Sequence, residues 1–157
     1  MSVQIQAATL EDANAFAVLF NTVEAYHRQH MPSRYRQPPE NYAIEFFQQA
    51  LTSENSKIFF AVSDADIVGY ILVNIKEIGS SPMLNPGKFF FVEQLAISPA
   101  ARRRNIGTEL MNFAEQLAKK MGFNEVELNY WMFNDVAEKF YRTLGYEPRR
   151  VIVTKTL

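Results

Sequence analysis

The chain has 157 residues, 48% of them apolar and 21% charged, which is enough for one domain, residues 1–157, with a core of its own. It contains no cysteine, which excludes a disulfide framework, a zinc–thiolate site and a thiol nucleophile. The formal charge of −1 argues against a nucleic-acid-binding surface. No basic and apolar leader and no run long enough to cross a membrane is present, so we expect a cytoplasmic protein without membrane contact.

The first half of the chain predicts a strand, two helices separated by a break, and a hairpin of two further strands. Apolar residues alternate at the start, and Thr9 and Asp12 have the spacing of a capping box that opens a helix. Residues 26–39 break the helical pattern with three prolines. The predicted elements are, in order, a strand over residues 3–7, a helix after Thr9, a helix over residues 40–51 and a hairpin of residues 57–63 and 67–77.

The second half alternates strands and helices. Residues 79–87 form a loop by composition, and residues 88–97 are almost all apolar, as in a strand that is covered on both faces. A helix then follows with Ile106 and Leu110 on its apolar side, and Gly122 is its expected C-cap. The remaining predicted elements are a strand over residues 125–131, a short helix over residues 135–144 and a last strand over residues 149–156. This order predicts an α/β fold around a mixed sheet.

A basic turn follows the most apolar strand. Ser98 and Pro99 end the strand, the run Arg102–Arg104 follows, and a helix begins at or just before Gly107. The first turn of a helix offers free N–H groups and a positive dipole end, and a glycine lets the backbone approach an anion. The stretch therefore predicts a phosphate or pyrophosphate site. Taken alone, a short arginine run is more often a solvated turn, and neither the Walker A nor the Rossmann glycine pattern is present.

Two stretches together resemble the GCN5-related N-acetyltransferase (GNAT) superfamily. Residues 95–99, Leu-Ala-Ile-Ser-Pro, followed by Arg-Arg-Arg-Asn-Ile-Gly at 102–107, resemble its motif A, [QR]-x-x-G-x-[GA] after a strand. Residues 134–146, NDVAEKFYRTLGY, meet every fixed position of motif B, N-x-x-A-x-x-[FL]-Y-x-x-x-G-[FY]. One position departs from the family: Asn105 replaces the first glycine of motif A. Asparagine tolerates left-handed backbone angles, so the loop can keep its shape.

The resemblance implies an α/β fold with a mixed, mostly antiparallel central sheet, a splayed pair of parallel strands, and helices on both faces. It also implies acetyl-CoA as co-substrate and transfer of the acetyl group to a primary amine, of a small molecule or a peptide, by direct attack in a ternary complex. A non-catalytic CoA-binding regulator of the same fold is the alternative. A nucleic-acid-binding module built on the arginines is a weaker rival. A homodimer paired through residues 149–156 stays possible.

The resemblance also assigns the residues that contact the co-substrate. Backbone groups at the end of the splayed strand pair with the pantetheine arm, the amides of the following turn hold the pyrophosphate, and motif B contacts the arm. On this chain the assigned residues are Leu95, Ala96, Ile97, Arg102, Arg103, Arg104, Asn105, Ile106, Gly107, Thr108, Asn134 and Ala137.

Catalysis needs an acid for the leaving thiolate and a base for the amine. Tyr141 matches the motif B tyrosine that is proposed as the acid; the alternative is a core aromatic residue. Glu93, a carboxylate within an apolar strand, is the candidate base, since burial would raise its pKa. The equal alternative is a Glu93 at the solvent end of the strand or paired with an arginine. Glu127 is the reserve candidate, and Asn129 stands where some relatives carry a glutamate.

The break at residues 26–39 lies where GNAT relatives place loops on the acceptor side. We therefore interpret Tyr26, His27, Arg34 and Tyr35 as candidate substrate-wall residues, whose arginine favours an acceptor that carries a carboxylate. His27 and His30 are three residues apart but have no third ligand, so we expect exposed polar residues and no metal site.

Overall fold

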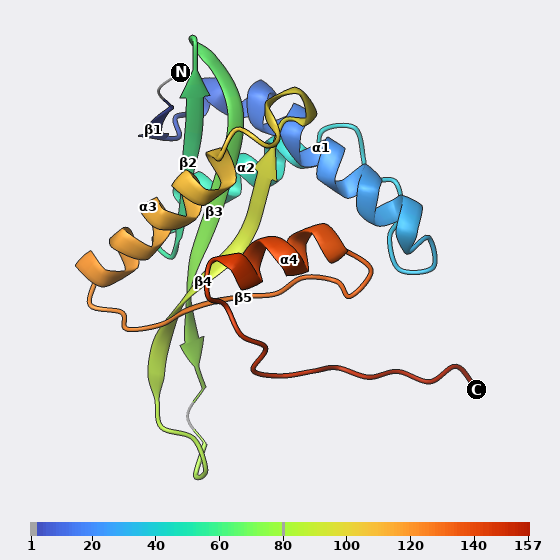
Figure 1. Ribbon diagram of the computed structural model, residues 1–157, viewed down its shortest axis with the longest axis vertical. Helices are drawn as coiled ribbons and strands as arrows, with labels where there is room; N and C mark the ends of the chain where they lie inside the picture. The colour runs from blue at the N-terminus through green and yellow to red at the C-terminus, as the bar shows by residue number, and fades with distance from the viewer. Residues whose placement is uncertain (1–2, 80) are drawn as a thin grey trace.

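The computed structural model describes residues 3–79 and 81–157, and a single mixed sheet lies at its centre (Figure 1). Its strands follow chain order across the sheet: β1 (Gln4–Ala7), β2 (Ser56–Ser63), β3 (Asp66–Ile78), β4 (Gly87–Ile97) and β5 (Val126–Leu128). The first four strands are antiparallel, and β5 is parallel to β4. This arrangement confirms the predicted mixed, mostly antiparallel sheet with one parallel pair.

Helices cover both faces of the sheet. One core joins α1 (Ala13–His30) and α2 (Tyr42–Thr52) to one face, and the other joins α3 (Ile106–Lys120) and α4 (Asp135–Thr143) to the opposite face, which is turned toward the viewer in Figure 1. The alternation of side chains along the strands divides the cores: Ile71 and Val73 face α3, whereas Tyr70 and Leu72 face α1 and α2. No helix in the described ranges is long and apolar enough to cross a membrane.

A bulge in β4 determines where the sheet opens. Leu72 pairs with Gln94 and Val73 with Val92, so Glu93 is an extra residue without a partner on β3. On its other side, β4 pairs with β5 only up to Val92. Residues 93–97 therefore keep β3 on one edge and have no strand on the other within the described part of the chain. The predicted splayed pair begins at this bulge.

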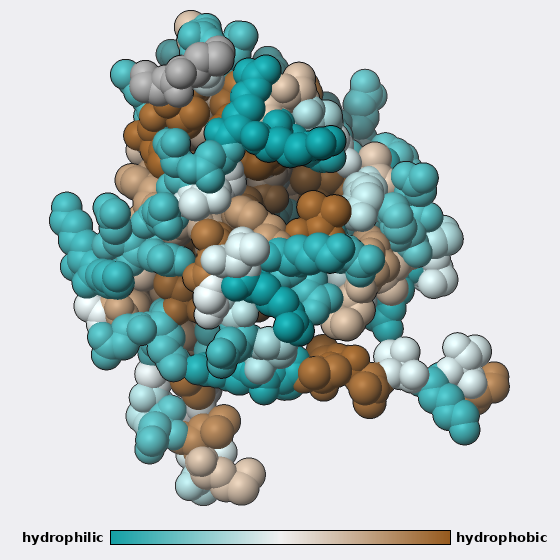
Figure 2. Space-filling model, viewed as in Figure 1, coloured by the Kyte–Doolittle hydropathy of each residue, from teal (hydrophilic) through white to brown (hydrophobic). Residues whose placement is uncertain are grey.

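Two predictions about segments were wrong. The predicted break at residues 26–39 begins later, because α1 continues through His30 and ends at Met31. Residues 149–156 form no strand: the chain from residue 147 onward is extended and exposed, with Ile152 and Val153 78% and 85% exposed (Figure 2). β-branched residues give a segment the tendency to be extended, but a strand also needs a neighbour for its backbone hydrogen bonds.

Smaller differences concern element ends. The first strand begins at Gln4, the second helix runs over Tyr42–Thr52, and β5 has only three residues where seven were expected. Of the expected loop at residues 79–87, Gly87 belongs to β4 and residue 80 lies outside the described residues. The capping box is as predicted: the Thr9 backbone N–H donates to Asp12 Oδ2 at 2.8 Å.

Candidate functional site

The basic turn forms a left-handed approach to α3. After the single 3-10 turn Pro99–Ala101, Arg103 (φ 61°) and Asn105 (φ 64°) both adopt left-handed angles, and α3 begins at Ile106. Glu109 is the first residue whose N–H is bonded back, to Asn105 O at 3.1 Å. The N–H groups of residues 106–108 have no acceptor among the described residues, and Arg102, Arg103 and Arg104 are exposed around them. This geometry suits an anion.

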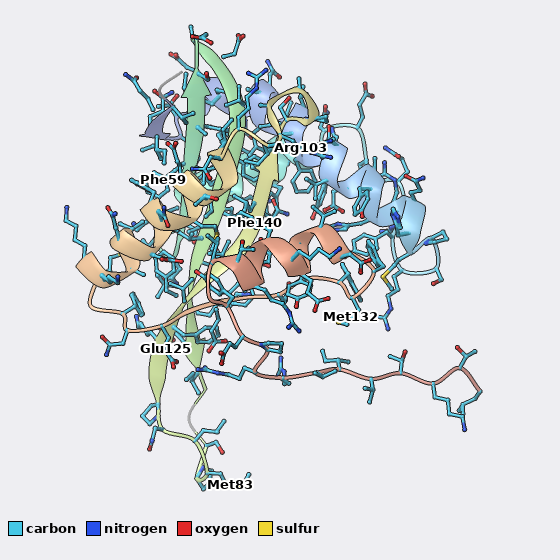
Figure 3. All side chains as sticks on the ribbon, viewed as in Figure 1. Phe59, Met83, Arg103, Glu125, Met132 and Phe140 are labelled. Atoms are coloured by element: carbon cyan, nitrogen blue, oxygen red, sulfur yellow. The ribbon has the colours of Figure 1, made fainter. Side chains whose placement is uncertain are left out.

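The reason for a glycine at 107 differs from the one expected. A Cβ on Gly107 would lie 3.1 Å from Cζ of Phe140, so the residue lets the start of α3 approach α4. Figure 3 shows Phe140 projecting from α4 toward α3, below the turn that carries Arg103. The side of Gly107 that carries no side chain therefore faces Phe140 of α4.

The strand edge that precedes the turn is open. Leu95, Ala96 and Ile97 pair with Ile71, Tyr70 and Gly69 of β3, and their other edge has no strand beyond the bulge in the described chain. Unpaired backbone groups on a strand edge accept an extended amide-bearing ligand as an added strand. The edge leads directly into the turn with the free amides, which puts a strand-like site and an anion site in line.

Asn134 begins α4 and uses one side of its amide group to do so. Its Oδ1 accepts a hydrogen bond from the N–H of Ala137 at 3.1 Å, as an N-cap does. The Nδ2 group of Asn134 stays available as a donor, whereas the N–H of Ala137 is engaged in the cap. Of the two predicted motif B contacts, only Asn134 thus retains a free polar group.

Tyr141 lies in the α3–α4 core and is 9% exposed. Its ring lies 5.9 Å from those of Tyr130 and Tyr146. Its hydroxyl forms no hydrogen bond with the described residues, yet it is not among the enclosed polar atoms that lack a partner. Burial raises the pKa of Tyr141 to about 12, so it holds its proton throughout the neutral range. Tyr141 thus occupies the core position of the alternative interpretation and also has a protonated phenol without a partner among the described residues.

Both candidate bases are paired with cations. Glu93 is not enclosed: its side chain is 35% exposed, its Oε2 lies 2.7 Å from Nζ of Lys76 and accepts a hydrogen bond from Asn74 Nδ2 at 3.1 Å. The expected burial of Glu93 is therefore wrong, and the alternative of an ion pair holds with a lysine in place of an arginine. Glu127 accepts from Nη1 of Arg149 at 2.8 Å.

The four candidate wall residues come together at the end of α1. The rings of His27 and Tyr35 are 5.1 Å apart, Tyr26 lies on the preceding position, and Arg34 lies over the Trp131 ring at 5.7 Å. Trp131 Nε1 also donates to Tyr35 Oη at 2.7 Å. The cluster thus joins α1 and the loop after it to the segment between β5 and α4.

Sequence reasoning missed the contribution of the β5–α4 segment. Trp131 and Phe133 complete the cluster, and the ring of Phe133 stacks on that of His30 at 4.8 Å. Met132, which lies between the two aromatic residues in the sequence, is exposed (Figure 3). Phe133 immediately precedes the N-cap Asn134, so the cluster lies beside the first turn of α4. Its only sequence signal was a run of aromatic residues just before motif B. In residues 3–79 and 81–157, no three acidic or histidine side chains form a metal-binding group.

Comparison with known proteins agrees with this arrangement. Residues 20–146 match the model of the acetyltransferase (GNAT) family. An N-alpha-acetyltransferase of Sulfurisphaera tokodaii is 33% identical over 118 residues, which cover 73% of this chain and 70% of that protein. An uncharacterized N-acetyltransferase of Methanocaldococcus jannaschii is 26% identical over 148 residues, 94% of this chain; the chain spans 62% of that relative's length.

Solved structures share the fold. A tetramutant of the BH1408 protein from Bacillus halodurans superposes with a TM-score of 0.92 at 22% identity, over 98% of this chain and 99% of that one. An aminoglycoside N-acetyltransferase in complex with CoA, AAC(6')-Iy, superposes with a TM-score of 0.78 at 17% identity, over 99% and 95% of the two chains. The family model matches residues 20–146 of this chain, the β4–β5 pair is bulged and splayed, and the turn before α3 is open. This chain therefore belongs to the GNAT family of acetyltransferases.

Proposed function

We propose that this protein transfers the acetyl group of acetyl-CoA to a primary amine held in the same complex. The observation that carries the proposal is the alignment of two open backbone features: the β4 edge over residues 93–97 and the free amides of residues 106–108. A ligand that fits both has an extended chain with amide groups and an anionic end. CoA has this form, with a pantetheine arm and a pyrophosphate, and when bound as its thioester it supplies the acetyl group.

The residues of this chain would hold the ligand through the backbone. Leu95, Ala96 and Ile97 offer N–H and C=O groups to the arm, and the α3 amides with their positive dipole end bind the pyrophosphate. Arg102–Arg104 add positive charge at the same point. Asn134 donates from Nδ2 on the opposite side of the opening, since its Oδ1 is held by the cap.

Tyr141 would hold the proton that the leaving sulfur needs. Its phenol is protonated, is not bonded to another side chain, and lies on the helix that Asn134 begins. A pKa near 12 makes it a weaker acid than a free phenol, so it gives up its proton only where strong negative charge develops. Such a donor does not ionise before the reaction.

The cluster at the end of α1 supports a choice of acceptor. Arg34 offers a guanidinium group beside the aromatic surface of Trp131 and Tyr35. A guanidinium binds a carboxylate with two parallel hydrogen bonds, so we propose a small-molecule or peptide acceptor with a carboxylate near its amine. The S. tokodaii relative is named an N-alpha-acetyltransferase, and the AAC(6')-Iy neighbour an aminoglycoside acetyltransferase.

The test is release of free thiol from acetyl-CoA against a panel of amines, comparing the wild type with Tyr141→Phe. The variant keeps the ring in the core and loses the proton, so acetyl-CoA affinity should be retained while turnover falls by roughly 10²–10⁴-fold. Binding of acetyl-CoA without turnover of any amine would favour the CoA-binding regulator. Equal turnover of wild type and variant, with chemistry rate-limiting, would remove Tyr141 from the mechanism.

A further inference from the structure

A primary amine enters the reaction as an ammonium ion and must lose a proton before it attacks. The carboxylates singled out by the sequence are engaged elsewhere: Glu93 with Lys76, and Glu127 with Arg149. Helix α1 carries another titratable pair, Glu24 and His27, which the proposed mechanism leaves unused. The two side chains of this pair are more buried than those of an ordinary surface ion pair.

His27 has one enclosed nitrogen and one open nitrogen. Its Nδ1 is the enclosed side-chain atom that lacks a hydrogen-bond partner within residues 3–79 and 81–157, and it lies 3.5 Å from Oε1 of Glu24. Both side chains are about one-fifth exposed. The other ring nitrogen, Nε2, is not enclosed and bonds to no described residue. A carboxylate beside Nδ1 favours the tautomer with the proton on Nδ1, which leaves a lone pair on Nε2.

An electrostatic effect and a hydrogen bond connect this pair to the open edge of β4. Burial, with the charge of Glu24 as a second cause, raises the pKa of Tyr70 on β3. The Tyr70 hydroxyl donates to Oε1 of Gln94 at 2.8 Å, and Gln94 directly follows the bulge residue Glu93. The hydrogen bond thus lies at the point where β4 separates from β5.

A second series connects the pair to α4. The His27 ring lies 5.1 Å from that of Tyr35 and 6.4 Å from that of Phe133. Phe133 precedes Asn134, which caps the helix that carries Tyr141. Aromatic contacts thus connect His27 to the start of α4, which lies at one side of the opening in the sheet.

We propose that His27 accepts the proton of the acceptor ammonium at Nε2 and that Glu24 is the positioning residue that holds the ring from Nδ1; this assignment rests on the proposed acetyl transfer. One N–H bond of the ammonium breaks, the proton binds Nε2, and the resulting imidazolium is stabilised by the Glu24 carboxylate. The freed lone pair forms the C–N bond as the C–S bond breaks, and Tyr141 protonates the sulfur. The second proton of the amine nitrogen then restores the phenol.

The ionisable groups around His27 come from three elements. Glu24 and Tyr26 lie on α1 itself, Tyr35 lies on the loop that follows α1, and Tyr70 on β3 is a group whose pKa the charge of Glu24 helps to raise. The segment before α4 contributes Trp131 and Phe133, which do not ionise; Arg34 lies over the Trp131 ring. Glu24 is the anion that lies against the His27 ring, so its removal is the change that acts most directly on the ring.

The test is the pH dependence of kcat/KM for an amine that the wild type acetylates, at saturating acetyl-CoA. His27→Gln should lower kcat/KM roughly 10²–10⁴-fold at neutral pH, and the deficit should shrink as the pH approaches the pKa of the amine. Glu24→Gln should lower kcat/KM by less than His27→Gln does, because the ring remains but loses the carboxylate that orients it. Glu45→Gln, on an exposed glutamate of α2, should leave kcat/KM and its pH dependence unchanged.

Nitrogen-15 NMR of the two histidines gives a readout that does not depend on turnover: His27 should be the Nδ1–H tautomer in the wild type and lose this preference in Glu24→Gln. An Nε2–H tautomer in the wild type overturns the assignment. So does a His27→Gln deficit that stays constant with pH. Wild-type turnover that His27→Gln and Glu24→Gln leave unchanged overturns this inference alone, whereas a wild type that acetylates no amine overturns the proposed function and this inference with it.

Discussion

Gly107 at the start of α3 lies against the ring of Phe140 on α4, and a Cβ at this glycine would come within 3.1 Å of Cζ of that ring. The contact links the turn that we propose binds the pyrophosphate to the helix that carries Tyr141. It has a direct consequence for substitutions at residue 107.

We expect Gly107→Ala to lower the free energy of unfolding by about 1–3 kcal/mol, because the added methyl group overpacks the α3–α4 contact. Phe140→Leu in the same chain should recover part of that loss, which a double-mutant cycle by urea unfolding measures. Gly79→Ala is the control, since nothing lies within 4 Å of its Cβ position. Additive effects at 107 and 140 would show that the two residues do not constrain each other.

Arg103 and Asn105 should respond differently to glycine. The left-handed region of backbone angles costs an L-residue about 1–2 kcal/mol, and asparagine less, so glycine removes this strain. Glycine also gives the unfolded chain more conformational freedom, which lowers the stability of the folded state. We expect Arg103→Gly to raise the unfolding free energy by about 0.5–1 kcal/mol and Asn105→Gly by less, measured without ligand. Arg102→Gly, at φ −64°, should only destabilise. Destabilisation by Arg103→Gly equal to that by Arg102→Gly would contradict this explanation.

Asn105→Gly also tests the departure from the family motif. The backbone already adopts the left-handed angle with asparagine, so the substitution removes the side chain while the loop keeps its shape. If the asparagine side chain crowds the pyrophosphate, calorimetry should show tighter CoA binding in the variant. Weaker binding would mean that the side chain contributes a contact of its own.

Tyr141 should make stability depend on pH in the alkaline range. Its pKa is about 12 in the folded protein and about 10 when unfolded, so the unfolded state loses the proton first. The resulting contribution, about 3 kcal/mol from two pKa units, is fully present below pH 10 and is lost as the pH rises from 10 to 12. Tyr141→Phe should remove this part of the slope. Parallel slopes for the two proteins in denaturant titrations from pH 9 to 12 would contradict the raised pKa.

The hydrogen bond that Trp131 Nε1 donates to Tyr35 Oη should stabilise the cluster of aromatic residues at the end of α1. Tyr35→Phe removes the acceptor of an indole N–H and should cost about 0.5–1.5 kcal/mol. Trp131 is the only tryptophan, so its emission reports the change directly. Tyr42→Phe, on an exposed tyrosine, is the control. An unchanged emission spectrum in Tyr35→Phe would show that the bond does not persist in solution.

Much of the fold could be predicted because its signals are local. Alternation, helical spacing and turn residues predicted both hairpin strands, β4, α3 and α4, and the tolerance of Asn105 for a left-handed angle is realised. The wrongly predicted segments have the local pattern of the element that was expected, but their neighbours in the fold determine a different structure. Residues 149–156 have β-branched residues but pair with no strand of the described chain, and residues 26–30 remain helical because their rings pack on Phe133 and Tyr35.

The sequence by itself determined the family, the order of the elements up to α4 and the location of the turn that we propose binds an anion, since each depends on residues that are close together in the chain. Only the tertiary structure decided which groups are enclosed and which are paired. Glu93 is not a buried base, because Nζ of Lys76 on the neighbouring strand lies 2.7 Å from its carboxylate, and the bare side of Gly107 faces Phe140, 33 residues later in the chain. The enclosure of the His27 Nδ1 nitrogen likewise follows only from the tertiary structure, because the residues that pack against a side chain set its burial and its electrostatic surroundings. The spacing of residues along the chain does not contain this information.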